Sequence, residues 1–372
     1  MITPFFPTKT DYKGIYIYDQ VKEIQKQTGF NIQIIKVVSF FSNETDYMYD
    51  GFNVIVIKIL DLPFFIFPGL FNYINRFRVN SLIEKKGIFN IRYIHAHVTY
   101  PSAYLANMIS DKTEAYTIVQ HHGIDILQLN NGRINFIRRL QASYLIKKSI
   151  KELNNISRNI GVSKRVINEL QSYKDYNPKM NEYIFYNGVD TSKFYPLKVK
   201  KNNEFIIGCV ANFYKIKDHI TLIKAVHYLS VEGKKIKLRL IGSGPTLTAC
   251  YNYVHKHNLA SIITFESEKA HNELNVFYNE IDLFVLPSFY EALGCVYLES
   301  WATNTPFIGI QGQGIAEVIS KKQQDVYLAK ANNLISLKEC ITTVMDSNNK
   351  FLFDKKYDIR NTVSNFLNNC II

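Results

Sequence analysis

Short apolar runs rich in β-branched residues recur along the whole chain, and segments with a helical spacing of apolar positions separate them. Repeated strand–helix units of this kind are typical of parallel sheets with helices on both faces. In the first half the pattern predicts strands at 32–38, 53–60, 91–96, 115–120 and 156–162, and helices at 14–29, 101–110 and 130–151. The first half therefore predicts a doubly wound α/β domain.

The second half repeats the pattern, with strands predicted at 204–210, 235–242, 261–266, 281–287 and 305–310. Helices are expected to begin near Asp218, Pro245, His271 and Leu293. A polar, charged stretch at 196–203 separates the halves, so we expect an N-terminal domain over 1–196 and a second domain over 203–350. Ligands of doubly wound sheets bind beyond the carboxyl ends of the strands. We therefore expect two Rossmann-like domains that face each other across a ligand-binding cleft.

The cysteine spacing and the apolar segments indicate the cell compartment in which the protein acts. The five cysteines lie far apart and none forms a CxxC motif, so the sequence indicates neither a zinc site nor a disulfide framework. The first residues lack the basic and apolar regions of a signal peptide. The most apolar segment, 62–74, is shorter than the roughly 20 residues that cross a bilayer. We therefore expect a cytoplasmic protein.

Positive charge is concentrated in one segment of a chain whose formal net charge is +12. Residues 130–151 hold several arginines and lysines, no acid, and interleaved apolar residues. This pattern is typical either of an ordinary surface helix or of a helix that rests on an anionic membrane surface. No nucleic-acid-binding motif accompanies the charge, so we expect no nucleic-acid partner.

Glycines and lysines follow several predicted strands. Gly242 and Gly244 in IGSGP would allow close backbone approach, and so would Gly312 in GIQGQG. Such a turn suits either a nucleotide or a purely structural requirement. Lys215 and Lys217, which follow the strand at 204–210, are either solvated surface lysines or cations that meet phosphate.

The stretch FYEALGCVYLES contains Glu291 and Glu299 with seven residues between them. A helix is expected to begin near Gly294, and the backbone N–H groups of Gly294, Cys295 and Val296 would favour an anion such as a diphosphate. Eight helical residues span about 12 Å, so the two acids would contact different parts of one extended ligand. A sugar nucleotide has two sets of hydroxyls, on its ribose and on its hexose. The alternative is a helix-capping acid and an unrelated buried acid.

Histidines gather at two predicted strand ends. His121 and His122 are adjacent and should point to opposite faces of a strand, whereas His95 and His97 should share one face. We expect one histidine of the adjacent pair to face the ligand. A metal would need a third ligand that the sequence does not offer, so we predict no metal site.

These segments, in this order, resemble the retaining glycosyltransferases of the GT-B fold, family 4. ITPFFP with Gly14 is similar to the opening strand and glycine loop of that family, and IHAH to its iHaH strand end. TIVQHHGIDI places His122 on the family histidine, and IFYNGVDTSKFYP is similar to the family's viPNGVD motif. The pair Glu291 and Glu299 matches the E-x7-E motif. The resemblance implies a GT-B fold for nearly the whole chain.

The resemblance also implies roles for individual residues. Glu291 would hold hydroxyls of the donor sugar, Glu299 the ribose hydroxyls and Lys217 the diphosphate, while His122 would lie near the reacting carbon. We take His122 and Glu291 as catalytic, and we place His95 and His97 on the acceptor side. The donor-binding set implied in this way is Gly14, Asn212, Lys217, Gly242, Gly294, Cys295, Val296, Glu299, Gly312 and Gly314.

No metal or other cofactor is implied, because cationic side chains and helix N-termini stabilise the departing diphosphate in this family. The last residues, 351–372, are similar to the family's terminal helix that returns to the first domain.

Two positions depart from the family pattern. Asn212 stands where the family has arginine, five residues before Lys217, and Asp218 stands where it has glycine. The loss of a charged diphosphate contact costs roughly 1.5–3 kcal/mol, unless Lys215 replaces it.

The leading hypothesis is a transferase that moves a hexose from a nucleotide sugar, with UDP favoured, to a glycan or lipid-linked glycan in surface polysaccharide biosynthesis. It would act in the cytoplasm at the inner face of the membrane, which residues 130–151 would contact. One alternative is a catalytically degenerate relative that binds a partner transferase, which the departures at Asn212 and Asp218 favour. A second is a GT-B nucleotide-sugar epimerase, which would act without a glycan acceptor.

Overall fold

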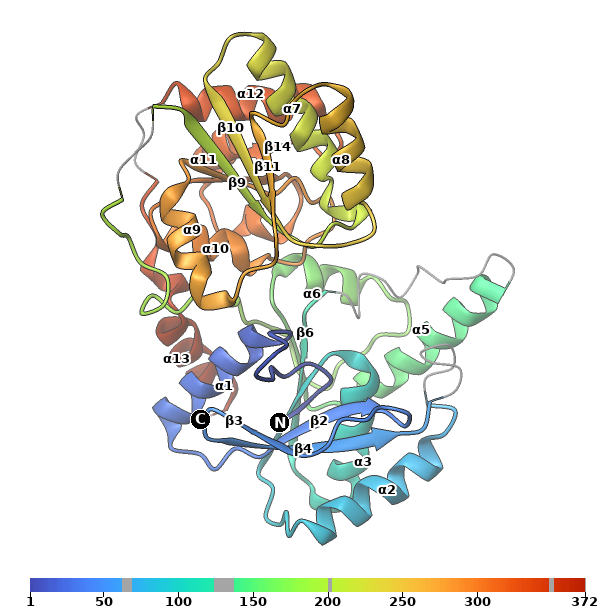
Figure 1. Ribbon diagram of the computed structural model, residues 1–372. Coiled ribbons are helices and arrows are strands. Elements are labelled where there is room, and N and C mark those ends of the chain that lie inside the picture. Colours follow the sequence, from blue (N-terminus) through green and yellow to red (C-terminus); the bar gives the residue numbers. More distant parts are fainter. Residues whose placement is uncertain (62–68, 124–136, 200–202, 348–350, 372) are drawn as a thin grey trace. The chain divides into compact units, whose positions relative to one another are not determined.

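The computed structural model describes residues 1–61, 69–123, 137–199, 203–347 and 351–371. The chain forms two compact units, of which one comprises residues 1–186 and 363–372 and the other residues 187–362 (Figure 1). Each unit is built on its own sheet.

The first unit contains an eight-stranded sheet in the order β3-β4-β2-β1-β5-β6-β7-β8. Every strand pairing is parallel except that of β3 with β4. The predicted doubly wound sheet is therefore confirmed, but the pattern predicted neither of its edge strands, the antiparallel β3 and the two-residue β8. The strands are β1 (Ile2–Thr3), β2 (Ile34–Ser39), β3 (Tyr47–Tyr49), β4 (Phe52–Ile59), β5 (Tyr93–His97), β6 (Tyr116–His121), β7 (Arg158–Gly161) and β8 (Tyr183–Ile184).

Helices connect these strands. They are α1 (Ile15–Thr28), α2 (Asn72–Lys85), α3 (Tyr104–Thr113), α5 (Ile137–Asn155) and α6 (Lys164–Gln171), with a π-helical turn, Thr99–Ala103, before α3. The helices predicted at 14–29 and 101–110 are present within a few residues. The pattern missed α2, because this helix carries apolar side chains on its buried face, such as Val79, and on its exposed face, such as Phe77.

The predicted basic helix at 130–151 corresponds to α5, although residues 130–136 lie outside the described residues. The C-terminal half of α5 packs in the core of the first unit, where Ile150 and Leu153 are buried. This half of the helix is therefore oriented by its packing in the core, and not by contact of a basic face with a surface.

The second unit contains six parallel strands in the order β11-β10-β9-β12-β13-β14. The strands are β9 (Phe205–Val210), β10 (Ile236–Ile241), β11 (Ile263–Glu266), β12 (Leu283–Val285), β13 (Phe307–Ile310) and β14 (Leu328–Ala329). The helices of this unit are α7 (His219–Val231), α8 (Leu247–Lys256), α9 (Leu274–Glu280), α10 (Cys295–Ala302), α11 (Lys321–Tyr327) and α12 (Leu334–Met345), and the last helix, α13 (Ile359–Cys370), begins in it. The short 3₁₀ turns are η2 (Lys215–Lys217), η3 (His271–Glu273), η4 (Gly314–Glu317) and η5 (Lys355–Tyr357).

The strands of the second sheet are covered on both faces, and Ile207, Leu238 and Phe284 have no exposed surface. Burial on both faces explains why these strands are near-continuous apolar runs instead of alternating patterns. The chain order along the sheet reverses between β9 and β12, which defines the point where ligands of such sheets bind. No helix in the described ranges is both long and apolar enough to cross a membrane.

The segment between the two sheets differs from the boundary that composition suggests. Residues 187–196, which the sequence assigned to the first domain, belong to the second unit. The backbone N–H of Tyr195 donates to Asn275 Oδ1 at 3.0 Å, and Val189 pairs with Asp358. Charge and polarity mark the linker at 196–203, but these backbone and side-chain contacts determine which unit holds the preceding residues.

The C-terminal helix α13 contributes residues to both units, since the second unit ends at Thr362 and the first includes residues from Val363 onward. Within the first unit, the Phe366 ring stacks on Phe185 with their centroids 4.4 Å apart. Tyr93 OH donates to the Ile371 carbonyl at 2.6 Å. These contacts explain why the last turns of α13 pack with the N-terminal sheet.

Candidate functional site

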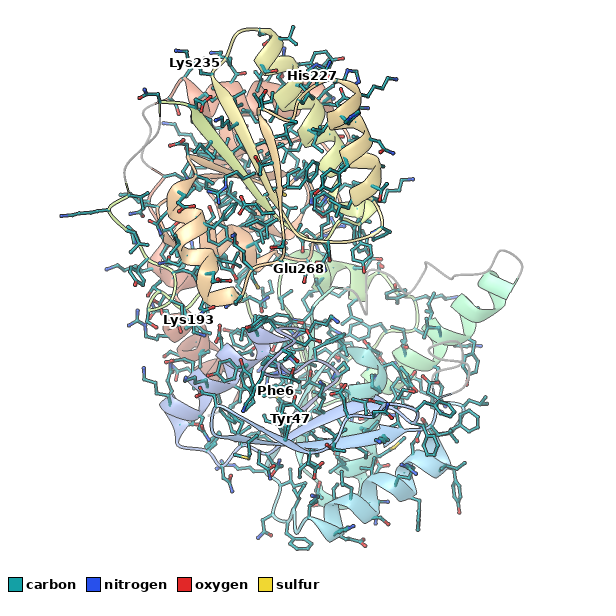
Figure 2. All side chains as sticks on the ribbon, viewed as in Figure 1. Phe6, Tyr47, Lys193, His227, Lys235 and Glu268 are labelled. Atoms are coloured by element: carbon teal, nitrogen blue, oxygen red, sulfur yellow. The ribbon has the colours of Figure 1, made fainter. Side chains whose placement is uncertain are left out.

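The predicted donor-binding residues of the second unit lie in loops after successive strands. Lys217 follows β9, Gly242 follows β10, Glu291 follows β12 and Gly312 follows β13. Because these strands are parallel, their carboxyl ends and the loops after them lie at one edge of the sheet. In Figure 2, Glu268, which follows β11, lies at the opposite end of the second unit from Lys235, which precedes β10.

Lys217 and Glu291 form an ion pair at this edge. Lys217 Nζ lies 2.6 Å from Glu291 Oε2, and the two side chains are 21% and 16% exposed. The Ser288 hydroxyl and the Phe289 N–H both donate to the Ile216 carbonyl at 3.1 Å, which holds the two loops together. The lysine therefore compensates the carboxylate that stands in the apolar stretch FYEALG, and the pair presents a cation beside an acid.

Glu299 has different partners. It lies on α10, is 7% exposed and accepts a hydrogen bond from Tyr278 OH at 2.9 Å. His271 Nε2 lies 3.0 Å from its other oxygen. Burial, together with the neighbouring carboxylate, raises the pKa of Tyr278 well above its usual value, so the phenol remains a donor. No spacing or motif in the sequence linked His271 or Tyr278 to Glu299.

Helix α10 begins where the sequence predicted. Its N-cap residue is Gly294, with φ 82°, and a Cβ there would lie 2.7 Å from the Tyr297 ring. The helix starts at Cys295, so the N–H groups of its first turn, including that of Val296, lie at an N-terminus suited to an anion. Asn187 Nδ2 also contacts Cys295 Sγ at 3.4 Å, a contact that the sequence did not suggest.

The predicted glycines differ in what they contact. A Cβ on Gly242 would lie 2.2 Å from the Ala211 carbonyl oxygen, and one on Gly314 would lie 1.6 Å from that of Ala292. Gly312 has φ 72° but nothing within 4 Å of its Cβ position. Packing within the protein therefore requires Gly242 and Gly314, whereas backbone conformation alone favours glycine at 312.

One of the two departures from the family pattern, Asp218, has a local explanation. Asp218 is the N-cap residue of α7 with φ 52°, a left-handed conformation that glycine and aspartate tolerate. Its Oδ1 accepts from the Thr221 hydroxyl at 2.8 Å, so the first turn of α7 holds the carboxylate. Asn212 and Lys215 are both exposed, and Lys215 begins the 3₁₀ turn that contains Lys217.

In the first unit, three histidines form a stack at the carboxyl ends of β5 and β6. The rings of His95 and His97 are 4.5 Å apart, and His97 Nδ1 lies 2.8 Å from His122 Nε2. His121 lies on the other face, 3.2 Å from Asn159 Oδ1. The predicted opposite orientation of the adjacent histidines and the shared face of His95 and His97 are therefore both confirmed.

Tyr16 and Gly14, at the start of α1, belong to the same unit as this stack. The Tyr16 ring lies 5.0 Å from the ring of His122. Gly14, the N-cap residue of α1, has φ 84°, and a Cβ there would lie 2.5 Å from the Phe5 carbonyl oxygen. His95 and His97 are buried, and the acceptor-side role of both remains a prediction. Among the residues with described positions, no group of three or more His, Cys, Asp or Glu could hold a metal ion.

The buried histidines should make the fold sensitive to acid. Burial lowers the pKa of His95 to about 3 and that of His219, in the second unit, to about 4, from an ordinary 6.5. At a pH between 6.5 and the lowered pKa of each histidine, the unfolded chain binds a proton that the folded chain does not. The free energy of unfolding therefore decreases as the pH falls below 6.5. Each such histidine costs up to about 1.4 kcal/mol per pH unit in this window.

Urea unfolding at pH 7 and pH 5 would measure this loss, which we expect to be about 2 kcal/mol for His95. The variant His95→Gln should lose less stability than the native chain between the two pH values. The same replacement at His255, which is exposed on α8, serves as the control and should leave the acid loss unchanged. An equal loss in all three proteins would contradict the assignment.

Comparisons with known proteins add to this geometry. Residues 193–358 match the family model described as Glycosyl transferases group 1. EpsF of Bacillus subtilis is 31% identical over 138 residues, which is 34% of this chain and only 35% of EpsF. The alpha-monoglucosyldiacylglycerol synthase of Streptococcus pneumoniae is 22% identical over 321 residues, covering 82% of this chain and 70% of the synthase. The crystal structure of Anabaena HepE in complex with UDP and glucose has a TM-score of 0.73 at 14% identity and covers 99% of this chain and 98% of HepE.

Proposed function

We propose that this chain, which has the GT-B fold and whose residues 193–358 form a Glycosyl transferases group 1 domain, is a retaining glycosyltransferase. It moves a hexose from a UDP-sugar to a glycan or a lipid-linked glycan of surface polysaccharide biosynthesis. It acts in the cytoplasm at the inner face of the membrane, and it needs no metal.

The pairing of Lys217 with Glu291 is the observation that carries this proposal. In a sugar nucleotide the hexose is bonded directly to the diphosphate, so a cation for the phosphate and a carboxylate for the hexose hydroxyls must be adjacent. Lys217 Nζ and Glu291 Oε2 are 2.6 Å apart, which meets this requirement. Glu299, which lies on α10 and has its own partners in His271 and Tyr278, then remains for the ribose hydroxyls.

The residues of this edge would act on charge that develops in the reaction. The bond between the hexose C1 and the diphosphate oxygen breaks, and the acceptor oxygen bonds to C1 on the same face. The acceptor proton passes to the departing phosphate. Lys217 and the first-turn amides of α10 stabilise the negative charge on that phosphate, which is the usual source of catalytic power in such sites. Glu291 orients the hexose through its hydroxyls.

His122 keeps the role near the reacting carbon that the sequence assigns to it. Contact with His97 Nδ1 and with the Tyr16 ring restricts the orientation of the His122 ring. Burial lowers the pKa of His97 well below its usual value, so His97 stays neutral and acts on His122 as a hydrogen-bond partner without charge. We assign His122 to the reacting centre, and His95 and His97 to the acceptor side beside it.

UDP is favoured as the donor nucleotide, and HepE, whose structure contains UDP and glucose, supports this choice. The acceptor class is supported by the S. pneumoniae relative, whose name describes glycolipid synthesis. Thermal unfolding with UDP, GDP, ADP and CMP would test the donor. A nucleotide at 100 times its Kd should add about 2.7 kcal/mol of stability.

The variant Glu299→Gln should weaken UDP binding about tenfold to hundredfold, because an ionic hydrogen bond to the ribose is lost. Glu266→Gln, which removes a carboxylate paired with Arg239 on the same sheet, is the matched control and should retain UDP affinity. EDTA should change neither result. An absence of any nucleotide shift would favour the degenerate relative, and sugar epimerisation without acceptor would favour the epimerase.

A further inference from the structure

Helix α2 exposes an apolar face that the first unit does not use. The helix packs on β4 and α3 through its buried face, which includes Val79 and Ile83 (Figure 1). On the opposite face Tyr73 is 89% exposed and Phe77 is 72% exposed. These two residues are four positions apart and therefore neighbours on the helix surface. An aromatic pair with this exposure is not part of the core.

The loop after β2 extends this apolar surface. Phe41 is 68% exposed, and its ring lies 5.5 Å from that of Phe40. The Arg78 guanidinium of α2 lies 5.2 Å from the centre of the Phe40 ring, which connects the loop to the helix. The α2 face, as we define it, consists of Phe40, Phe41, Leu70, Tyr73, Ile74 and Phe77, all of them exposed.

A groove of about 660 Å³ lies beside the α2 face and is lined by Phe77, Lys58, Arg78 and Lys85, among others. None of these three cations forms an ion pair with a carboxylate in the described part of the chain. The acids in the groove do not compensate them, because both are paired with other lysines. Glu44 contacts Lys36 at 2.5 Å, and Asp46 contacts Lys86 at 2.6 Å.

Exposed aromatic side chains beside uncompensated cations have the chemistry of an interfacial membrane surface. Apolar patches on soluble proteins mark interaction sites, and interfacial helices combine Phe, Trp or Leu with Lys and Arg. A protein partner would account for the aromatic rings, but it would need several acids to match the groove. An anionic lipid bilayer supplies an apolar layer and a sheet of phosphates at once.

We propose that the α2 face docks on an anionic lipid bilayer, with its aromatic side chains at the headgroup level and with Lys58, Arg78 and Lys85 against lipid phosphates. The binding surface differs from the segment 130–151 that the sequence suggested. The docking would bring the chain to a lipid-linked acceptor, but the inference does not depend on transfer activity, because binding is measured without donor or acceptor.

Sedimentation of the full chain with vesicles tests this assignment. The vesicles contain either phosphatidylcholine alone or phosphatidylcholine with 30 mol% phosphatidylglycerol. We expect binding to the anionic vesicles that weakens with added salt, and little binding to neutral ones. The double variant Lys58→Glu/Lys85→Glu should lower the partition coefficient at least about 25-fold, since each cation near the surface contributes about fivefold.

The double variant Tyr73→Ser/Phe77→Ser should lower binding about tenfold or more, and it should do so at high salt as well. Val231→Ser and Lys321→Glu/Lys322→Glu replace exposed residues of the second unit and should bind like the native chain. Thermal unfolding of every variant shows that it is folded. Nucleotide-induced stabilisation is recorded separately, so a failure of the donor assignment is distinguishable from a failure of docking.

Three results would overturn the inference. One is equal binding to both vesicle types by native and variant chains. Another is loss of binding only in variants of α5 such as Lys147→Glu. The third is a concentration-dependent dimer, detected by light scattering, that Phe77→Ser dissociates while vesicle binding is absent. The third result would assign the α2 face to another copy of this chain.

Discussion

Replacement of Lys217 by alanine should lower kcat/KM for sugar transfer about a hundredfold. The change removes a charged contact to the donor diphosphate, worth about 1.5–3 kcal/mol. In the native protein Glu291 lies 2.6 Å from Lys217. Without the lysine, its carboxylate would stand unpaired beside the negatively charged diphosphate of the donor. Most of the loss should appear in kcat, because charge on the departing diphosphate is greatest in the transition state. Initial rates with a UDP-sugar and a glycan acceptor would measure it.

The double variant Lys217→Ala/Glu291→Gln separates the two effects. If repulsion from Glu291 contributes, the double variant should bind UDP more tightly than Lys217→Ala alone, although it should remain slow. Lys237→Ala removes a lysine paired with Glu204 on the same sheet and should leave kcat/KM within twofold. Native kcat/KM in Lys217→Ala would refute the assigned role of the lysine.

Replacement of Gly314 by alanine should destabilise the second unit by about 3 kcal/mol or more. The new Cβ would lie 1.6 Å from the Ala292 carbonyl oxygen, so backbone on one side must move. Overpacking of this kind costs 1–3 kcal/mol in side chains, and movement of the backbone adds to the cost. Urea unfolding followed by a probe in the second unit, such as the fluorescence of Trp301, would measure the loss.

Gly312→Ala is the matched control two residues away. A Cβ there meets nothing within 4 Å, so the cost should be only the left-handed backbone, about 1 kcal/mol. If a folded Gly312→Ala variant binds UDP more weakly, the added methyl group lies against the donor. Equal destabilisation by both substitutions would show that backbone conformation, and not the contact with Ala292, determines the requirement at 314.

The apolar pattern by itself located the main strands of both sheets, because strands buried on both faces form short continuous apolar runs. It did not locate the two-residue strands β8 and β14. Ile207 and Phe284, in such runs, are fully buried. The same pattern predicted that the candidate site loops lie together, because the segments that follow parallel strands lie at one edge of the sheet. The start of α10 at Cys295 was also local information, because Gly294 has a backbone conformation that glycine favours.

Tertiary structure decided what the local pattern does not contain. His271 and Tyr278 became partners of Glu299 only because α9 and η3 pack beside α10, across about 20 to 30 residues of chain. Short strands such as β1, with two residues, exist because their neighbours supply the hydrogen bonds that their length cannot. The apolar positions on both faces of α2 hid its helical period, and only the packed fold shows which face is buried and which remains for a partner.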